Sequence, residues 1–255
     1  MSKYIQIVTA ILVVLGMMAF MSCRCELNPS SSSQNQIHKD ISVKPFDEIS
    51  VNGSMNVYYE QGATRSVKLV CNADDAKRMD ISSDGKTLNI SYRHTVVFGI
   101  ERLDRINVYV SSPDLVNVHL SGSGEFYSKK HVDTDNIGIS LAGSGTIEFS
   151  DLICDNLSTS LVGSGDIGVD KVICASATLS CTGSGDLDAN IFKANKVNIS
   201  LQGSGDVSVK VKDCNNLVSS LAGSGDITLL GNVKTFDKNL IGSGDFNTDN
   251  LHVEK

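Results

Sequence analysis

The sequence predicts an all-β fold, a parallel β-helix with about 20 residues per coil. The triplet Gly-Ser-Gly occurs seven times at intervals of 19 to 21 residues, and apolar residues alternate with polar ones on both sides of it. A fixed period of this size is typical of solenoids, in which each repeat forms one coil and stacks on the next. No 3.6-residue period occurs within a repeat, which argues against a helical repeat.

The repeats align on the first glycine of each triplet. Two positions before that glycine, six of the seven copies have leucine and one has cysteine, and serine precedes this position in most copies. A leucine-rich repeat would need a different leucine spacing and usually a helix, so the alternation favours β-strands. Glycine allows the positive φ that a corner between two strands requires. The triplets begin at Gly122, Gly143, Gly163, Gly183, Gly203, Gly223 and Gly242.

Residues 1–22 have the pattern of a lipoprotein signal peptide. Lys3 precedes a mostly apolar run, and Ser22 stands directly before Cys23. A small residue before a cysteine marks the cleavage site of such a signal, so we expect Cys23 to be the lipidated first residue of the mature chain. The alternatives are a plain secretory signal and an uncleaved anchor, for which the run is at the short limit.

The remaining chain divides into a tether and one domain. Residues 23–40 are polar and serine-rich, which predicts a flexible tether. Residues 41–120 predict irregular N-terminal coils and a cap, with Asn52-Gly53-Ser54 as a degenerate triplet, and residues 121–255 predict the regular coils of the same domain. No cap is evident after the last coil, and its open end predicts self-association into a homo-oligomer.

An acidic residue follows the triplet in six of the seven copies, which predicts a column of carboxylates along the stack. Neighbouring like charges at this spacing repel by roughly 1 kcal/mol in water, so the column needs compensation. A row of cations such as calcium is one answer, but one carboxylate per coil offers few ligands. We therefore favour carboxylates that accept backbone N–H groups of their own turn, and expect no metal and no cofactor. The regular column contains Asp166, Asp186, Asp206, Asp226 and Asp245.

The seven cysteines include no C-x-x-C pair, which argues against a zinc ribbon or a thioredoxin-like site. Cys154 and Cys174 occupy the same repeat position, so adjacent coils bring them within disulfide range. Ala194 stands in the same column and favours a buried slot for small side chains. Free buried thiols are the preferred interpretation, and a disulfide between Cys154 and Cys174 is the alternative.

The repeats lack the residue clusters of an enzyme. The five histidines are scattered, and no arginine follows Arg105. A polysaccharide lyase on a β-helix would need grouped carboxylates with an Arg or Lys base. Carbohydrate-binding surfaces usually present tryptophan or tyrosine, whereas this chain has no tryptophan and Phe149 and Phe246 fall on inward positions. The net charge of -7 also argues against nucleic acid as a partner.

The segment from Arg93 to Arg105 is rich in functional groups, with His94, Glu101, Arg102 and Asp104 around the apolar Val96-Val97-Phe98, and it interrupts the strands. This segment predicts either a loop that touches a partner or an insertion whose charges pair with one another. The second interpretation is favoured, because surface loops commonly carry such self-paired charges.

Two early stretches, residues 46–53 and 108–115, are followed by the Leu-x-Gly-Ser-Gly-Asp-Ile copies. In this order they resemble the family called "putative auto-transporter adhesin, head GIN domain", over nearly all of residues 45–255. The resemblance implies a right-handed parallel β-helix on an exported, often lipid-anchored, bacterial envelope protein. It implies no site residues.

These observations predict a non-enzymatic envelope lipoprotein whose β-helix serves adhesion or scaffolding. Its expected partners are a membrane, through the lipid on Cys23, and a glycan or an extracellular protein. Arg24 after the lipidated cysteine favours the outer membrane, by analogy with other lipoproteins. The alternatives are a glycan-active β-helix enzyme and a periplasm-facing structural or sensing lipoprotein.

Overall fold

The computed structural model describes residues 36–93 and 105–254. All of them belong to one of the two compact units of the chain, Asn35–Lys255. The predicted signal peptide, Cys23 and residues 94–104 of the Arg93 to Arg105 segment lie outside the described residues. No helix within the described ranges is long and apolar enough to span a bilayer.

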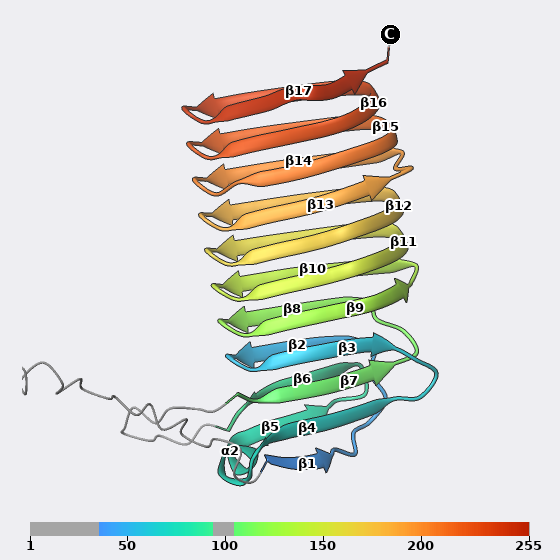
Figure 1. The fold of residues 1–255 in the computed structure, drawn as a ribbon, viewed down its shortest axis with the longest axis vertical. Coiled ribbons are helices and arrows are strands. Elements are labelled where there is room, and N and C mark those ends of the chain that lie inside the picture. Colours follow the sequence, from blue (N-terminus) through green and yellow to red (C-terminus); the bar gives the residue numbers. More distant parts are fainter. Residues whose placement is uncertain (1–35, 94–104, 255) are drawn as a thin grey trace, which may run out of the picture. The chain divides into compact units, whose positions relative to one another are not determined.

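The regular part of this unit is a stack of parallel coils that rises toward the C-terminus (Figure 1). Facing residues on neighbouring coils are about 20 positions apart: Gly143 lies beside Gly163, and Gly163 beside Gly183. The predicted parallel β-helix is therefore confirmed. Its strands are β8 (Asn117–Gly122), β9 (Glu125–Asp133), β10 (Asn136–Gly143), β11 (Thr146–Gly163), β12 (Asp166–Gly183), β13 (Asp186–Phe192), β14 (Lys196–Gly203), β15 (Val207–Gly223), β16 (Asp226–Gly242) and β17 (Asp245–Val253).

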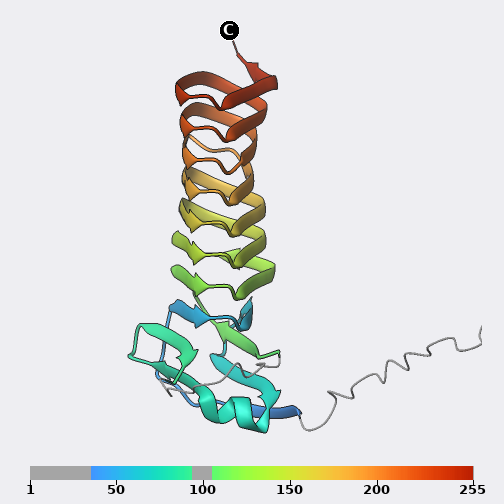
Figure 2. The same ribbon diagram turned by 90° about the vertical axis from the view of Figure 1, so that its left-hand side faces the viewer.

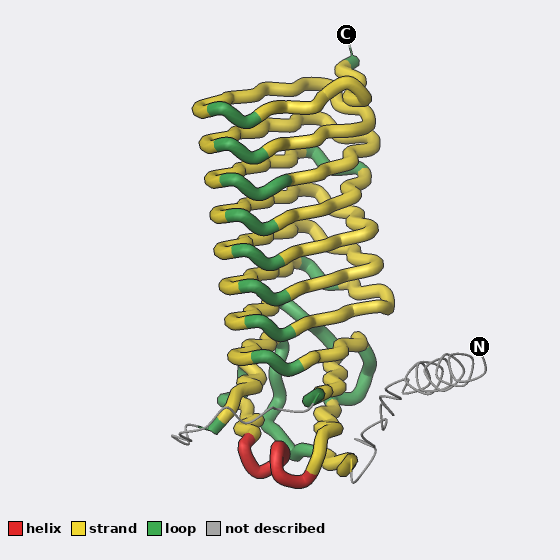
Figure 3. Tube along the Cα trace, turned by 60° about the vertical axis from the view of Figure 1, so that its left-hand side comes forward, coloured by secondary structure: helices red, strands yellow, loops and turns green. Residues whose placement is uncertain are grey.

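Each regular coil turns at its Gly-Ser-Gly triplet, and the turns line up along one edge of the stack (Figure 3). The first glycine of the triplet has a positive φ, for example +131° at Gly163 and +127° at Gly183. Glycine adopts this conformation without the steric cost that a Cβ would bring. The Gly163 carbonyl also accepts a hydrogen bond from the Ser184 N–H at 2.8 Å, which ties one turn to the next.

Aliphatic side chains fill the interior of the coils. Successive side chains of a strand point to opposite faces, so every second residue is buried and the serines between them face outward. Larger rings occupy the interior near the start of the stack, where Phe126 and Phe149 lie 5.6 Å apart between ring centroids, and at Phe246 on the last coil. The column before the triplet is buried at Leu120, Leu141, Leu161, Cys181, Leu201 and Leu221, whereas Leu240 on the last coil is 45% exposed.

Shorter elements build the N-terminal end of the unit, beneath the regular stack (Figure 2). One of them is a short helix, α2, whose N-terminus is capped by the Asn72 side chain accepting from the Asp75 N–H at 2.7 Å. The elements are β1 (Gln36–Asp40), β2 (Glu48–Gly53), β3 (Asn56–Gln61), β4 (Ser66–Asn72), α2 (Ala73–Arg78), β5 (Met79–Ser83), β6 (Thr87–Tyr92) and β7 (Asn107–Ser112).

These N-terminal coils do not stack in chain order. β2 pairs in parallel with both β6 and β8, and β3 pairs in parallel with both β7 and β9. The first coil, β2–β3, is therefore enclosed between the later coil β6–β7 and the start of the regular stack. Gly53 faces Gly122, which confirms the degenerate triplet at residues 52–54.

Antiparallel strands complete this end of the molecule. β4 runs antiparallel to β7 on one side and to β1 on the other. The prediction that the whole of residues 23–40 is a flexible tether is wrong for residues 36–40. These residues form β1, because the unpaired edge of β4 offers backbone partners to the incoming chain.

The last coil is more exposed than the others. Lys238 occupies a strand position that is inward on earlier coils, where Ile199 and Ser219 stand. The Lys238 Nζ lies 5.4 Å from the centroid of the Phe246 ring. A charged side chain at an inward position discourages a further strand from stacking there. Self-association through this end stays a prediction of the sequence.

Candidate functional site

The predicted acidic column exists as a row of exposed carboxylates along the turn edge. Oδ1 of Asp186, Asp206 and Asp226 each accepts a hydrogen bond from the backbone N–H of the aspartate one coil further on, at 3.0–3.2 Å. Asp166 begins this row and faces Asp186. The prediction that each carboxylate binds its own turn is wrong for these three, because stacking brings the N–H of the next coil to the carboxylate.

Asp245 differs because it lies on the last described coil. Its carboxylate accepts from the N–H of the adjacent Phe246 at 2.8 Å. Among residues 36–93 and 105–254, no three His, Cys, Asp or Glu side chains come together in a way that could hold a metal ion. Three carboxylates of the acidic column thus hydrogen-bond from one coil to the next.

Cys154 and Cys174 face one another on adjacent coils, as their repeat position predicts. Both are buried, and both are free thiols in the structure. A hydrogen bond with Cys174, together with burial, raises the pKa of the Cys154 thiol. The same hydrogen bond lowers the pKa of Cys174. Both side chains are buried and pack as part of the core.

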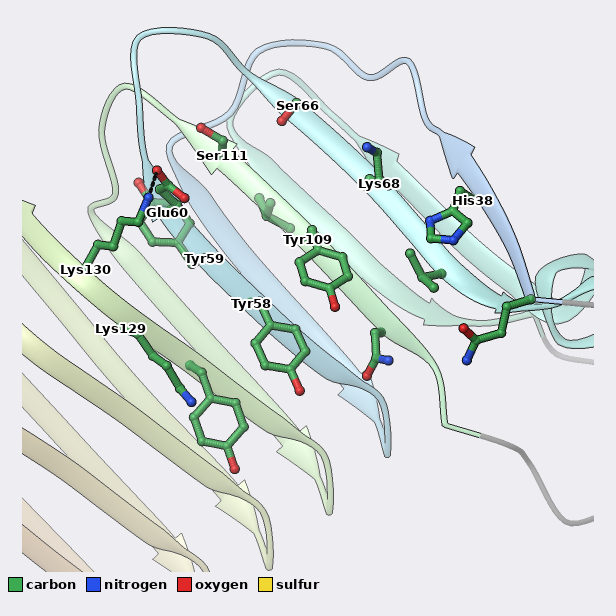
Figure 4. Close-up of a pocket in the computed structure, with 15 residues that line it drawn as sticks. His38, Tyr58, Tyr59, Glu60, Ser66, Lys68, Tyr109, Ser111, Lys129 and Lys130 are labelled. Atoms are coloured by element: carbon green, nitrogen blue, oxygen red, sulfur yellow. Dashed lines mark hydrogen bonds and ion pairs between the residues drawn. The ribbon is translucent and has the colours of Figure 1, made fainter. Parts of the chain in front are cut away.

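A different surface, at the N-terminal end of the stack, gathers the functional groups that the repeats lack. Tyr58 on β3 lies beside Tyr109 on β7 and Tyr127 on β9. The ring centroids are 5.1 Å apart for Tyr58 and Tyr109, and 5.7 Å apart for Tyr58 and Tyr127, with interplanar angles of 19° and 20°. Figure 4 shows the Tyr58 and Tyr109 side chains extending from neighbouring strands with their hydroxyls turned the same way.

These tyrosines form the floor of an open groove of about 710 Å³, called the tyrosine groove below. Strands β1, β4, β7, β3 and β9 lie next to one another and supply its outward side chains. Apart from the tyrosines, the outward groups are amines, amides, hydroxyls, an imidazole and one carboxylate. The lining residues are Gln36, His38, Tyr58, Tyr59, Glu60, Ser66, Lys68, Val70, Asn107, Tyr109, Val110, Ser111, Tyr127, Lys129 and Lys130.

The tyrosine groove carries a local excess of positive charge on an acidic protein. Lys130 is paired with Glu60, the one acidic residue of the lining. Lys68 and Lys129 have no ion pair with a described carboxylate, although Asp40 stands opposite Lys68 in the strand register. The Lys129 ammonium lies 5.5 Å from the centroid of the Tyr127 ring, an arrangement that holds the cation at the groove wall.

The environment of two tyrosines disfavours their ionised form. Burial raises the pKa of Tyr127 to about 12, and the nearby Glu125 carboxylate contributes to the shift. Burial likewise raises the pKa of Tyr59 to about 12, although its hydrogen bond with Ser112 opposes the shift. Both phenols therefore remain neutral hydrogen-bonding groups at physiological pH.

The sequence did not predict this groove, for a topological reason. The three outward-facing tyrosines lie in separate segments of the chain, and only the enclosure of coil β2–β3 between β7 and β9 brings them into one row. A signal was nevertheless present, because Tyr58, Tyr109 and Tyr127 each follow an inward residue, at Val57, Val108 and Phe126, and so face outward. The expectation that the chain lacks an aromatic surface is corrected by this row.

A β-solenoid with such a groove at one end has the form of an elongated binding or scaffolding protein. The chain belongs to the family described as "Putative auto-transporter adhesin, head GIN domain", whose model matches residues 45–214 and 177–255. No curated protein matches the sequence.

Several solved bacterial structures share the fold. A "putative adhesin" from Bacteroides fragilis is 23% identical, with a TM-score of 0.74 over 84% of this chain and 97% of that chain. A "putative lipid binding protein" from Parabacteroides distasonis is 22% identical, with a TM-score of 0.65 over 84% and 96%. A "putative adhesin" from Parabacteroides merdae is 18% identical, with a TM-score of 0.68 over 87% and 97%. At these identities the likeness establishes the fold alone.

Proposed function

We propose that the protein is a non-enzymatic, lipid-anchored adhesin of the bacterial cell envelope. The tyrosine groove is the observation that carries this proposal, since it offers exposed aromatic, cationic and hydrogen-bonding groups on a rigid scaffold. The family of the chain supports an adhesive role. The regular coils serve as a rigid support, because each is tied to its neighbours by parallel strand pairing over its whole length.

The anchor is the lipid on Cys23. Metabolic labelling with a palmitate analogue should mark the wild-type chain, and Cys23→Ala should abolish the label and release the protein from the membrane fraction. Cys25→Ala is the matched control, because it removes a cysteine two positions away and should leave the label in place. A wild-type chain without label would contradict the anchor.

The adhesin and the periplasmic lipoprotein are distinguished by the face of the outer membrane on which the protein is exposed. Protease treatment of intact cells should degrade a surface-exposed domain and spare a periplasmic control protein. If the chain survives until the outer membrane is permeabilised, the structural or sensing lipoprotein of the periplasm is the better description.

Adhesion itself is measured with cells that lack the gene and cells that express it. We expect expressing cells to bind immobilised glycans or matrix proteins more strongly, and Cys23→Ala to remove this gain.

Glycan turnover by the purified protein would instead support the enzyme alternative. That activity would have to disappear on substitution of acidic residues on one face of the stack.

A further inference from the structure

We propose that the tyrosine groove binds an acidic oligosaccharide, a hydroxyl-rich chain of sugar rings bearing carboxylate or sulfate groups. This inference rests on the proposed adhesive function and names the ligand class of its site. Three features carry it: the row of phenols, the unpaired lysines and the shape of the groove.

The row of phenols suits sugar rings. Tyr109 is the end of the row on the side of β4, where its cross-strand neighbour is Lys68 instead of another ring. Its side chain is 45% exposed, the highest value for a large apolar or aromatic residue in the groove. An exposed ring with a polar hydroxyl offers an apolar face to the C–H groups of a sugar and a hydrogen bond to its hydroxyls.

The unpaired lysines select the charge of the ligand. Lys68 on β4 lies beside Tyr109, and Lys129 on β9 lies two positions after Tyr127; neither has an ionic partner among the described residues. Glu60 does not cancel them, because it is bound to Lys130. The chain as a whole has a net charge of -7, so these lysines provide a local attraction for an anionic ligand, which the Glu125 and Glu148 carboxylates near Tyr127 oppose at the β9 end of the row.

The shape of the groove suits an extended ligand. It crosses five adjacent strands, and four spacings of about 4.8 Å give it a length of about 19 Å. Ser66, Ser111 and Asn107 lie along this path and offer further hydrogen bonds. Several sugar rings can therefore contact the groove at once.

An acyl chain fits this surface poorly. The aliphatic lining residues are Val70 and Val110, and both are buried beneath the groove with 7% and 3% exposure. An anionic lipid headgroup is the stronger competitor. β1 begins 13 positions after Cys23, so a lipid on Cys23 would keep the groove close to a membrane.

The test measures binding of the purified full chain to immobilised oligosaccharides of matched length. The probes are oligogalacturonate for carboxylate, heparin fragments for sulfate, and uncharged dextran as the neutral control. We expect binding to at least one acidic probe at least tenfold tighter than to dextran, weakening as salt is raised because the ion pairs are exposed. Equal binding to neutral and acidic probes, or binding to none, would overturn the proposal.

Variants assign the binding to the groove. Lys68→Ala and Tyr109→Ala should each weaken binding about tenfold, whereas Tyr109→Phe should retain most of it because the ring remains. Lys210→Ala is the matched control, since it removes an exposed lysine on β15, outside the groove lining. Lys129→Ala is a second groove variant. Because Lys68 and Lys129 are both exposed, both lysine variants should fold, and circular dichroism will verify this. Unchanged binding by all groove variants would refute the assignment.

Vesicles distinguish the competing ligand. Phosphatidylglycerol and phosphatidylcholine vesicles are added to the Cys23→Ala chain, so that no lipid anchor contributes. Groove-dependent binding to phosphatidylglycerol without binding to any acidic oligosaccharide would replace the proposal by a headgroup site. If cells expressing Lys68→Ala or Tyr109→Ala adhere as well as wild type, the adhesive function survives and the ligand assignment fails.

Discussion

The hydroxyl groups inside the coils show how individual residues limit the stability of the stack. Thr159 and Ser219 are buried at 1% exposure, and neither side-chain oxygen has a hydrogen-bond partner. Thr159 lies between Ile139 and Leu179, two apolar residues of the neighbouring coils. Burial of an unpaired hydroxyl costs free energy, so these positions weaken the core that surrounds them.

Thr159→Val should therefore stabilise the protein. Valine has the shape of threonine without the hydroxyl, and we expect the free energy of unfolding to rise by about 1 kcal/mol. Urea unfolding followed by circular dichroism measures the change. Thr178→Val, at an exposed position of the next coil, is the control and should change stability by no more than about 0.5 kcal/mol. A less stable Thr159→Val chain would mean that the hydroxyl has a partner in solution.

The shifted tyrosines make the groove region sensitive to alkaline pH. Tyr59 and Tyr127 should ionise at about pH 12, while unfolded tyrosine ionises near pH 10. The folded state thus holds these protons more tightly, and the stability this provides is present below pH 10 and lost as pH rises to about 12.

Ultraviolet difference titration tests these two pKa values. The native protein should show late-ionising phenols, and Tyr59→Phe and Tyr127→Phe should each remove one of them. The same protein in denaturant is the reference, where all tyrosines should titrate together near pH 10. A native curve identical to the denatured one would contradict the assignment.

The turn is the element on which the stack depends. The first glycine of each triplet combines a positive φ with close contact to the turn one coil before it. A Cβ on Gly183 would overlap the carbonyl oxygen of Gly163, which is already fixed by its bond to the Ser184 N–H. Neither turn can move without disturbing the parallel pairing of the strands that follow.

Gly183→Ala should therefore lower the free energy of unfolding by at least about 2 kcal/mol, from backbone strain and steric overlap together. Gly168→Ala is the matched control on the same coil. Its φ is not in the positive region, and the nearest atom to its Cβ would be Glu148 Cγ at 3.9 Å. We expect the control to stay within about 0.5 kcal/mol of wild type in thermal unfolding. Equal effects of the two variants would show that the corner does not need glycine.

At the scale of the whole molecule, the chain combines two kinds of construction. The regular coils contact their immediate neighbours through a constant register, and so behave as a one-dimensional array. The N-terminal end is interlocked, because coil β2–β3 pairs with strands that come both before and after it in the stack. Removal of residues should have different consequences in the two parts.

Deletion of residues 166–185 removes one regular coil and joins Gly165 to Asp186, which occupies the same register as Asp166. The shortened protein should fold with one coil fewer and a stack shorter by about 4.8 Å, measured by circular dichroism and solution scattering. Deletion of residues 66–85, which has the same length, removes β4, α2 and β5 and should unfold the N-terminal end. Loss of all structure in the first deletion would contradict nearest-neighbour stacking.

The regular coils could be predicted from the sequence because their structure is local and repeated. The period of the triplet, the alternation around it and the need for glycine at each corner determined the parallel β-helix, the inward leucine column and the position of the acidic row. Even there, the sequence could not show that Asp186, Asp206 and Asp226 bind the next coil, since that depends on how neighbouring turns stack.

Tertiary structure alone decided the N-terminal end and the groove. The sequence predicted irregular coils for residues 41–120 but contained no period that would order their strands. The stacking order β7, β3, β9 results from pairing between strands that are distant in the sequence. That non-sequential order places Tyr58 between Tyr109 and Tyr127, with Lys68 beside Tyr109. The array was determined by repetition within the sequence, whereas the groove was created by long-range strand pairing.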